Sequence, residues 1–345
     1  MIIEKDRNIE LLRGVMIILV VLGHAIIPEI RGNNLFFYNI WRIIYYFHMP
    51  VFFMISGYCC KEIKFNSLSD DEYKSFVKKK FKRLMLPYIF ISFANYTILL
   101  IATTVNSPIK VMLIESGYKF NGIVQSILEI ITFYGHFDDH VWFLYTLFII
   151  FLIIPVMKKI IKSEKKLIII YVLLSLLSYS GILDNTIPLL EKTCRYLLFV
   201  MIGLKLNFKS LNKCKVMKEG LRSIFIIFIL LNINGNSYII KAIEGIFKIV
   251  LSIDIMYLFY FLMIKLESNR ILEIVSKYSF EIYLLHQPFI TSGLVLILYK
   301  LLNIGDTMSI IISTIIGILI PIIMTIGYKN KNIICYRSSY YEKQI

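Results

Sequence analysis

Residues 11–28 read LLRGVMIILVVLGHAIIP, an apolar run that carries two ionisable side chains, Arg13 and His24. A helix that crosses a bilayer needs about 20 predominantly apolar residues. Comparable runs follow at 40–60, 84–105, 141–157, 167–182, 194–206, 223–240, 243–264, 278–300 and 308–328. The sequence therefore predicts an all-α integral membrane protein with about ten transmembrane helices. The short run at 194–206 and the run at 223–240, which contains Asn232 and Asn236, are candidates for broken or re-entrant segments.

The composition agrees with this class of protein. Of the 345 residues, 58% are hydrophobic and 18% charged, and the mean hydropathy is +0.72. These values exclude an ordinary water-soluble enzyme. The five cysteines form no C-x-x-C pair, so neither a disulfide framework nor a thiolate zinc site is indicated. Because no internal repeat or long polar stretch interrupts the chain, we expect one membrane domain over residues 1–345, with the first span retained rather than cleaved.

The distribution of basic residues predicts the orientation. Short cytoplasmic loops retain Lys and Arg, whereas translocated loops lose them. Of the 38 Lys and Arg, Arg13 lies inside the first span, and most of the others fall on the side that carries both termini. The exceptions are Arg31, Arg42, Lys110, Lys119, Lys192, Arg195, Lys241, Lys248 and Lys300. Both termini are therefore expected in the cytoplasm, and the protein in the plasma membrane. Basic loops beside anionic lipid account for the net charge of +15 without nucleic acid as a partner.

Ionisable residues inside a span cost about 2.5–3.5 kcal/mol on insertion scales, so each is a candidate functional residue. Arg13 and His24 are eleven residues apart, which places them on one helix face about 16 Å apart along the axis. Glu10 can pair with Arg13 at i, i+3. The alternative for Arg13 is an anchor that extends to the cytoplasmic interface, and for His24 a hydrogen bond between helices. Histidine is also a competent general base near neutral pH.

The second run contains FHMPVFFMISGY at 47–58, with His48 two residues before Pro50. A proline inside a span frees a backbone carbonyl, which is tolerated where protein or a cavity surrounds it. We therefore expect His48 to face the protein interior. Ser56 and Gly57 indicate close helix packing rather than a nucleophile. A serine hydrolase is disfavoured because no G-x-S-x-G motif occurs.

Two further segments carry polar residues. GHFDDHVWFL at 135–144 contains His136, Asp138, Asp139 and His140, whose side chains could bind zinc, but no second cluster accompanies them, so we predict no metal. In the ninth run Pro288 predicts a local break, and Glu281 and His286 precede it. For Glu281 and for Asp254 in the eighth run we favour hydrogen bonds between helices. His286 is left open between a structural and a chemical role.

Four of these segments together resemble the membrane acyltransferase-3 family. They are RNIELLRGVMIILVVLGH at 7–24, YYFHMPVFFMISG at 45–57, HVWFLYTLF at 140–148 and YSFEIYLLHQP at 278–288, in the family's order. The resemblance implies a ten-span protein that moves an acyl group, usually acetyl, from cytosolic acyl-CoA to a hydroxyl of a cell-surface polysaccharide or lipid-linked glycan. It implies acyl-CoA as donor substrate without a permanently bound cofactor, and a carbohydrate acceptor and membrane lipids as partners.

The resemblance also implies roles for individual residues. The family's arginine followed by a histidine after ten intervening residues corresponds to Arg13 and His24, and His24 would be essential for transfer. The family's pair of arginines at the start of the third span corresponds to Lys80 and Arg83, which would bind the CoA phosphates. Lys80 departs from the family's arginine, because an ammonium group is a point charge and cannot bind a phosphate through two parallel hydrogen bonds as a guanidinium does. The alternative for this basic cluster is the ordinary positive-inside topology.

Acyl transfer from a thioester needs a base for the acceptor hydroxyl, and His24 can act as that base or take the acyl group itself. His48 joins Arg13 and His24 as a candidate catalytic residue. Supporting positions are Glu10, His140, Trp142, Glu281 and His286. The main alternative to an enzyme is an exporter of a glycan or lipid-linked intermediate. A further alternative is a non-catalytic sensor or scaffold. An oligomer is compatible with the sequence.

Overall fold

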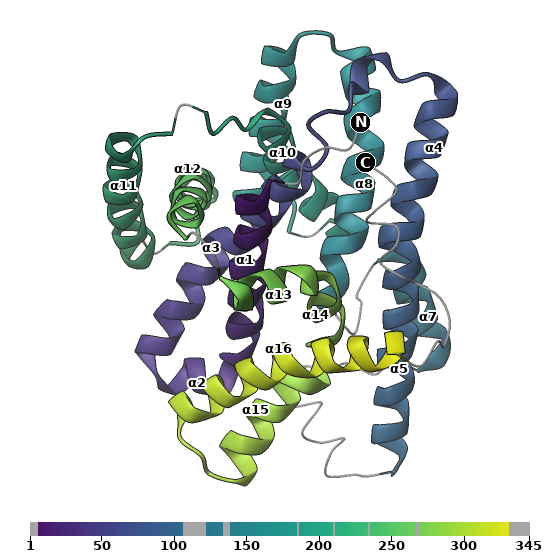
Figure 1. Cartoon of the computed structure of the whole chain (residues 1–345), viewed down its shortest axis with the longest axis vertical. Helices are drawn as coiled ribbons and strands as arrows, with labels where there is room; N and C mark the ends of the chain where they lie inside the picture. Colours follow the sequence, from purple (N-terminus) through teal and green to yellow (C-terminus); the bar gives the residue numbers. More distant parts are fainter. Residues whose placement is uncertain are drawn as a thin grey trace. The chain divides into compact units, whose positions relative to one another are not determined.

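The computed structural model describes residues 6–105, 122–133, 139–184, 186–209, 211–233, 235–266 and 269–330. All regular secondary structure in these ranges is helical, which confirms an all-α protein for this part of the chain (Figure 1). The elements are α1 (Arg7–Ala25), α2 (Pro28–Asn33), α3 (Leu35–Tyr58), η1 (Phe65–Ser67), α4 (Asp70–Lys80), η2 (Phe81–Met85), α5 (Leu86–Val105), α7 (Ile123–Thr132), η3 (Asp139–Val141), α8 (Trp142–Ile160), α9 (Glu164–Tyr179), α10 (Pro188–Lys205), α11 (Lys213–Asn232), α12 (Tyr238–Lys265), α13 (Arg270–Lys277), α14 (Ser279–Leu285), η4 (Phe289–Gly293), α15 (Leu294–Leu296), η5 (Ile297–Leu301) and α16 (Asp306–Asn330).

Several of these helices can cross a membrane. By length and composition, five described segments qualify, namely α1, Asp70–Ile101, α8, α12 and Asp306–Tyr328. Ser279–Leu285 and Phe289–Leu301, bent by 61° relative to one another, would form a sixth span if counted together. Each of the ten predicted runs coincides with helical structure, whereas the count of ten spans and the cytoplasmic termini stay predictions.

The break expected in the run 223–240 is present. α11 ends at Asn232 and α12 begins at Tyr238, so this apolar window is not one helix. Asn and Gly residues between the two helices favour turns over helix. Helix α11 instead starts at Lys213, where the Asn212 side chain accepts a hydrogen bond from the backbone N–H of Lys215.

The chain separates into two compact units. The first, which we call the terminal unit, comprises Met1–His48 and Met256–Ile345, and the second, the central unit, comprises Met49–Ile255. The division falls inside α3, just before Pro50, and inside α12. Each unit is described separately below, and the expectation of a single membrane domain stays a prediction.

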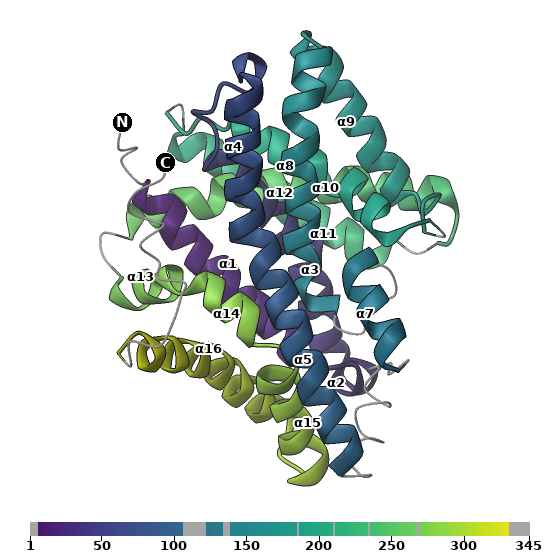
Figure 2. The ribbon, with the colours of Figure 1, turned by 90° about the vertical axis from the view of Figure 1, so that its right-hand side faces the viewer.

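In the terminal unit α1 packs against α13, α14, η4 and α16. In Figure 2, α1, α14 and α16 lie beside one another, with α13 at one end. Two glycines permit close approach. A Cβ at Gly14 would lie 2.8 Å from the backbone oxygen of Leu272 in α13. At Gly317 of α16 it would clash with the Thr291 hydroxyl and lie 2.9 Å from a methyl group of Val21 in α1.

In the central unit α10 packs against α8 and α9, and α4, η2 and α5 follow one another without interruption. Figure 2 shows this long helix from end to end. Gly57 of α3 and Gly203 of α10 face each other, because a Cβ on Gly57 would clash with the backbone of Val200 and one on Gly203 with the backbone of Met54. The predicted packing role of Gly57 is confirmed, and Ser56 donates a hydrogen bond to the carbonyl of Phe52 within its own helix.

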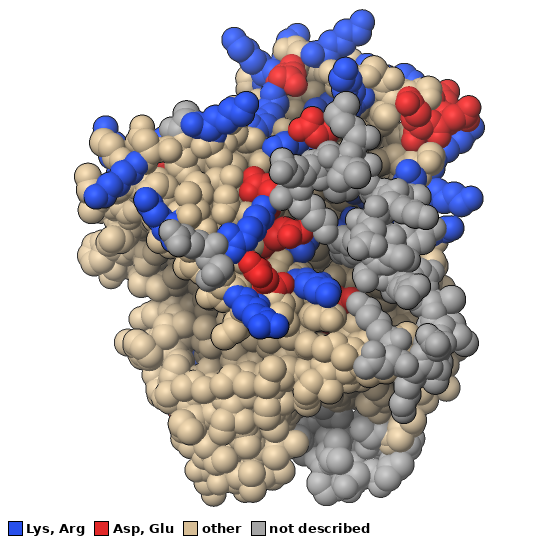
Figure 3. All heavy atoms as spheres, in the orientation of Figure 1, with Lys and Arg blue, Asp and Glu red and all other residues tan. Residues whose placement is uncertain are grey.

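Charged side chains are unevenly distributed over the terminal unit. Figure 3 shows Lys, Arg, Asp and Glu gathered over α13 and the start of α1, whereas the surface over α15 and α16 below shows none. The α13 group includes Arg7 and Glu273, whose ion pair measures 2.8 Å. This arrangement is typical of a protein whose apolar surface lies in lipid and whose charged edge lies in water.

Candidate active site

Helix α1 holds the two ionisable residues predicted to act in its span. It begins after Asp6, whose side chain accepts hydrogen bonds from the backbone N–H groups of Asn8 at 3.1 Å and Ile9 at 3.4 Å. It then continues unbroken to Ala25. Arg13 and His24 therefore lie on one helix, three turns and about 16 Å apart along its axis. Any movement of α1 as a rigid helix carries both residues together.

The Arg13 end of α1 is held by α13. Nη2 of Arg13 lies 3.3 Å from both the backbone oxygen and the hydroxyl of Ser276. Gly14 permits this contact because α13 passes too closely for a side chain. The Arg13 Nε is buried and has no hydrogen-bond partner among the described residues. Glu10 lies one turn before Arg13, in the first turn of α1, and its predicted ion pair with Arg13 stays a prediction.

The His24 end of α1 brings together three of the predicted histidines and one tyrosine. The ring centroids of His24 and His286 are 5.2 Å apart, and those of His24 and Tyr45 are 6.3 Å apart. Tyr45 in turn lies 4.8 Å from His48. We call these four residues the histidine cluster. All of them belong to the terminal unit, although α1, α3 and the end of α14 supply them from distant parts of the sequence.

Backbone carbonyls fix the orientation of two of these histidines. Nδ1 of His286 lies 2.9 Å from the oxygens of Ile282 and Tyr283, and Nδ1 of His48 lies 2.7 Å from that of Ile44. A carbonyl only accepts, so Nδ1 carries the proton in both rings. In the neutral ring Nε2 is then the basic nitrogen. Both side chains are buried, which confirms the prediction for His48.

Two polar residues after His286 hold the backbone at His24. The Gln287 Nε2 donates to the Ser292 hydroxyl at 2.7 Å, and that hydroxyl donates to the His24 carbonyl at 3.2 Å. The last carbonyls of a helix have no partner within it, and Ser292 satisfies one of them for α1. Ser292 lies in η4, just beyond the bend that follows α14. The predicted break at Pro288 is thus present and places a donor at the end of α1.

Two carboxylates differ from each other in their environment. Glu281 lies half-buried in the first turn of α14 and makes no hydrogen bond or ion pair with a described residue, so its predicted interhelical hydrogen bond is not formed. Asp254, by contrast, is fully buried and paired with Arg222, whose Nε lies 2.7 Å from Oδ2. This bidentate pair joins α12 to α11 inside the central unit and confirms the prediction for Asp254.

The other predicted site residues lie in the central unit. Lys80 turns inward at the end of α4, with Nζ 4.1 Å from the ring centroid of Phe151 and 3.3 Å from the sulfur of Cys60. Arg83 is exposed in the π-helical turn η2. His140 is buried in η3. Trp142 begins α8 and packs against Tyr196, with 5.1 Å between the ring centroids. The ammonium group of Lys192 lies 5.0 Å from the Trp142 ring centroid.

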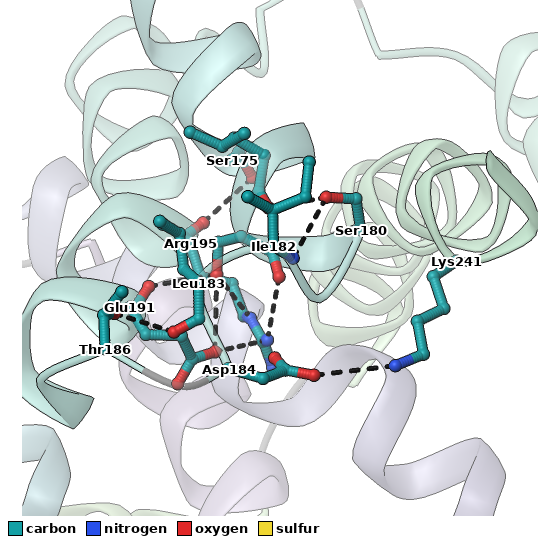
Figure 4. A network of polar contacts seen from close by, with 11 residues as sticks. Ser175, Ser180, Ile182, Leu183, Asp184, Thr186, Glu191, Arg195 and Lys241 are labelled. Atoms are coloured by element: carbon teal, nitrogen blue, oxygen red, sulfur yellow. Dashed lines mark hydrogen bonds and ion pairs between the residues drawn. The ribbon is translucent and has the colours of Figure 1, made fainter. Parts of the chain in front are cut away.

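A polar network in the central unit ties α9, α10 and α12 together (Figure 4). Arg195 pairs with Glu191 and donates from Nε to the Ser178 hydroxyl at 3.1 Å. Lys241 of α12 reaches Asp184 at 3.5 Å, across the turn that follows α9. These groups satisfy one another, so we assign the network to packing of the helices. No group of three or more potential metal ligands occurs in the described part of the chain, and His136 and Asp138 lie outside it.

Sequence reasoning missed four residues of this site: Tyr45, Ser276, Gln287 and Ser292. Tyr45 precedes His48 by three residues and so shares its helix face. Gln287 directly follows His286. Both could have been included on position alone. Ser276 and Ser292 carry no such signal, because each is an ordinary serine whose role depends on which helix it meets.

The chain matches a family model described as "Acyltransferase domain", Acyl_transf_3, over residues 6–326. It is also 42% identical over 57 residues to the nodulation protein NolL of Sinorhizobium fredii (strain NBRC 101917 / NGR234). That match covers 16% of this chain and 16% of NolL. No solved structure matches the chain. Because the family model spans nearly the whole sequence, including α1 and the histidine cluster, the chain belongs to the acyltransferase-3 family of membrane acyltransferases.

Proposed function

We propose that this protein is a membrane O-acyltransferase. It transfers an acyl group, usually acetyl, from cytosolic acyl-CoA to a hydroxyl group of a cell-surface polysaccharide or lipid-linked glycan, at the plasma membrane. The observation that supports this most is the histidine cluster around His24, at the end of the helix that also carries Arg13. Family membership supports the acyl transfer, and the carbohydrate acceptor follows from the resemblance.

His24 is the reactive group in this proposal. It lies in the last turn of α1, where helix carbonyls favour positive charge nearby, as a base that takes up a proton requires. The His286 ring packs edge-on against it and is itself held by two carbonyls. A base whose neighbours are fixed in this way needs little reorganisation during reaction. His286 and, through Tyr45, His48 thus act as positioning residues.

Arg13 marks the donor end of the same helix. Its half-buried guanidinium, whose buried Nε has no hydrogen-bond partner among the described residues, favours an anionic or carbonyl group of the donor. The resemblance also assigns the CoA phosphates to Lys80 and Arg83 of the central unit, where Lys78, Lys79 and Lys82 add positive potential. Along α1 the acyl end of the donor lies toward His24, and the acceptor arrives from the side opposite Arg13.

The reaction exchanges a thioester for an oxygen ester. The acceptor hydroxyl gives its proton to His24 as its oxygen attacks the thioester carbonyl. The carbon–sulfur bond then breaks, and the proton passes to the CoA thiolate. In the covalent alternative the acyl group moves first to His24 and then to the acceptor. Both routes consume acyl-CoA and release free CoA and the acylated glycan.

The test is transfer of labelled acetyl from acetyl-CoA into glycan by membranes that contain the protein. Matched samples carry wild type, His24→Ala and Leu19→Ala, which removes a half-buried side chain from the same helix. We expect label with wild type and Leu19→Ala, and a loss of at least about 10²-fold with His24→Ala. Partial recovery on adding imidazole would identify a missing base rather than a misfolded helix.

The same samples separate the remaining alternatives. If His24 carries the acyl group, rapid denaturation at neutral pH after incubation without added acceptor leaves label on wild-type protein and none on His24→Ala. Full activity in His24→Ala would overturn the catalytic assignment. No label in any sample, with several acyl-CoA donors and acceptor-rich membranes, would favour the exporter.

A further inference from the structure

Helix α3 carries a row of aromatic rings that ends at the histidine cluster. Tyr38, Trp41, Tyr45 and His48 are spaced three, four and three residues apart, so they share one helix face. The ring centroids of Tyr38 and Trp41 are 6.3 Å apart and stacked, and those of Trp41 and Tyr45 are 4.6 Å apart. We call Tyr38, Trp41 and Tyr45 the aromatic row.

The row is accompanied by cations. The guanidinium of Arg31 in α2 lies 4.1 Å from the Trp41 ring centroid, and that of Arg42 lies 5.5 Å from the Tyr38 ring centroid. A guanidinium that stacks on a ring still presents N–H donors at its edge. The row therefore combines flat apolar faces with hydrogen-bond donors beside them.

Tyr38 and Tyr45 are each 37% exposed, although Tyr45 also contacts His24 and His48. They are seven positions apart, which corresponds to about 10 Å along the helix, a length that a disaccharide covers. A pyranose ring offers a face of C–H bonds that packs on an aromatic ring, and a rim of hydroxyls that accept from arginine. The exposed rings, the donors and the reactive histidine thus form one continuous line.

From this arrangement we infer that the aromatic row is the acceptor subsite, where a saccharide chain lies along α3 with one hydroxyl presented to His24. This inference rests on the proposed transfer of an acyl group to a glycan and adds the residues that bind the acceptor. Tyr38 and Arg31 hold the sugar distant from the reaction, and Tyr45 lies beside the sugar that is acylated. The donor meets none of these residues, because Arg13 lies at the other end of α1.

An aromatic row beside a bilayer has one competing explanation. Tyr and Trp are enriched at membrane interfaces, where their rings lie at the level of the lipid headgroups. Such a belt needs no continuity with a catalytic histidine and no stacking between its members. Here each ring contacts the next, and the last contacts His24.

The chain offers a direct probe, because Trp41 and Trp142 are its two tryptophans. In full-length protein carrying Trp142→Phe, emission reports on Trp41 alone. We expect a saturable change in emission on adding cellotetraose or tetra-N-acetylchitotetraose. Tyr38→Ala should weaken this binding about tenfold, and Arg31→Lys by several-fold. The matched control is Phe36→Ala, which removes an aromatic ring that is 67% exposed on the opposite face of the same helix and should leave binding unchanged.

Transfer kinetics provide the second measurement, with the same tetrasaccharides as acceptors. Tyr38→Ala should raise the acceptor concentration at half-maximal rate about tenfold and leave that for acetyl-CoA unaltered. Emission that no saccharide changes, but that brominated lipids quench, would overturn the inference and identify an interfacial belt. Saccharide binding without any acyl transfer would leave the subsite standing and refute the proposed function, so the two failures are distinguishable.

Discussion

A single methyl group added to Gly317 of α16 tests the packing that holds the His24 end of α1. Its Cβ would clash with the Thr291 hydroxyl and lie 2.9 Å from a Val21 methyl group. Overpacking of a tight site costs about 1–3 kcal/mol. Alanine also gains about 0.5–1 kcal/mol over glycine within a helix. The net loss for Gly317→Ala is therefore about 0–2.5 kcal/mol.

A second substitution should relieve most of this loss. The Thr291 hydroxyl is buried and has no hydrogen-bond partner among the described residues, so Thr291→Ala sacrifices no hydrogen bond. In the double variant the closest obstacle at position 291 is the Cβ, 3.5 Å away, which is an ordinary contact. We expect Thr291→Ala alone to be nearly neutral and the double variant to recover at least half of the lost stability.

The assay is the fraction of detergent-solubilised protein that stays monodisperse after heating, combined with acyl transfer at a permissive temperature. Gly327→Ala is the matched control, since it lies on the same helix with nothing within 4 Å of the added group. It should be neutral or slightly stabilising. Because Thr291 adjoins Ser292, which bonds to the His24 carbonyl, Gly317→Ala should also lower activity. Equal effects of Gly317→Ala and Gly327→Ala would refute the reasoning.

Three further predictions concern the donor end and the helix contacts. Arg13→Ala should raise the acyl-CoA concentration at half-maximal rate without changing that for the acceptor; an effect on the acceptor alone would contradict its placement. Gly57→Ala should destabilise the protein by about 1–3 kcal/mol, because the added methyl group would clash with the backbone of Val200, which cannot rotate away. Thermal stability measures this loss, and a neutral result would contradict the contact. The hydrogen bond from Lys205 lowers the pKa of the Glu164 carboxyl below its usual 4.5. This ion pair therefore stabilises the folded state above pH 4.5, and the stabilisation is lost as the pH falls through the lowered pKa. The stabilities of wild type and Lys205→Met should differ by at most about 1 kcal/mol at pH 7 and converge in acid.

The sequence predicts the helical framework well because a bilayer allows so few structures. Every backbone N–H and C=O in lipid must be paired within the segment, so a long apolar run that is not a strand of a barrel forms a helix. Hydropathy alone does not place a turn between apolar residues, and the break between Asn232 and Tyr238 is indicated instead by the asparagines there. A search for long apolar runs also overlooks α4 and α13, whose mean hydropathy is low although the apolar residues of α13 share one face. Helix α4 is instead marked by its cap, where Ser69 and Glu72 bond reciprocally to each other's backbone.

The site is only partly accessible from the sequence. Arg13 and His24 share a helix, so their relation follows from its periodicity, and the structure has that helix unbroken. His24 and His286 are 262 positions apart, and no local pattern predicts that their rings meet. For Glu281 the expected interhelical hydrogen bond is absent among the described residues, because its formation depends on which helix packs alongside.

The bend after α14 gives the strongest physical reason to locate the chemistry at His24. A straight helix pairs its own carbonyls and offers its neighbour no backbone donors or acceptors, whereas a break at membrane depth is tolerated only where protein or a cavity surrounds it. Here the break lies against the end of α1, so two interrupted helices meet at one point. The Ser292 hydroxyl satisfies a carbonyl of α1, and the His286 ring satisfies two of α14. The polar groups released by both interruptions thus converge on His24, while the opposite end of α1 stays locked to α13. A proton acceptor placed at that meeting point is fixed in position on several sides, as general-base catalysis inside a membrane requires.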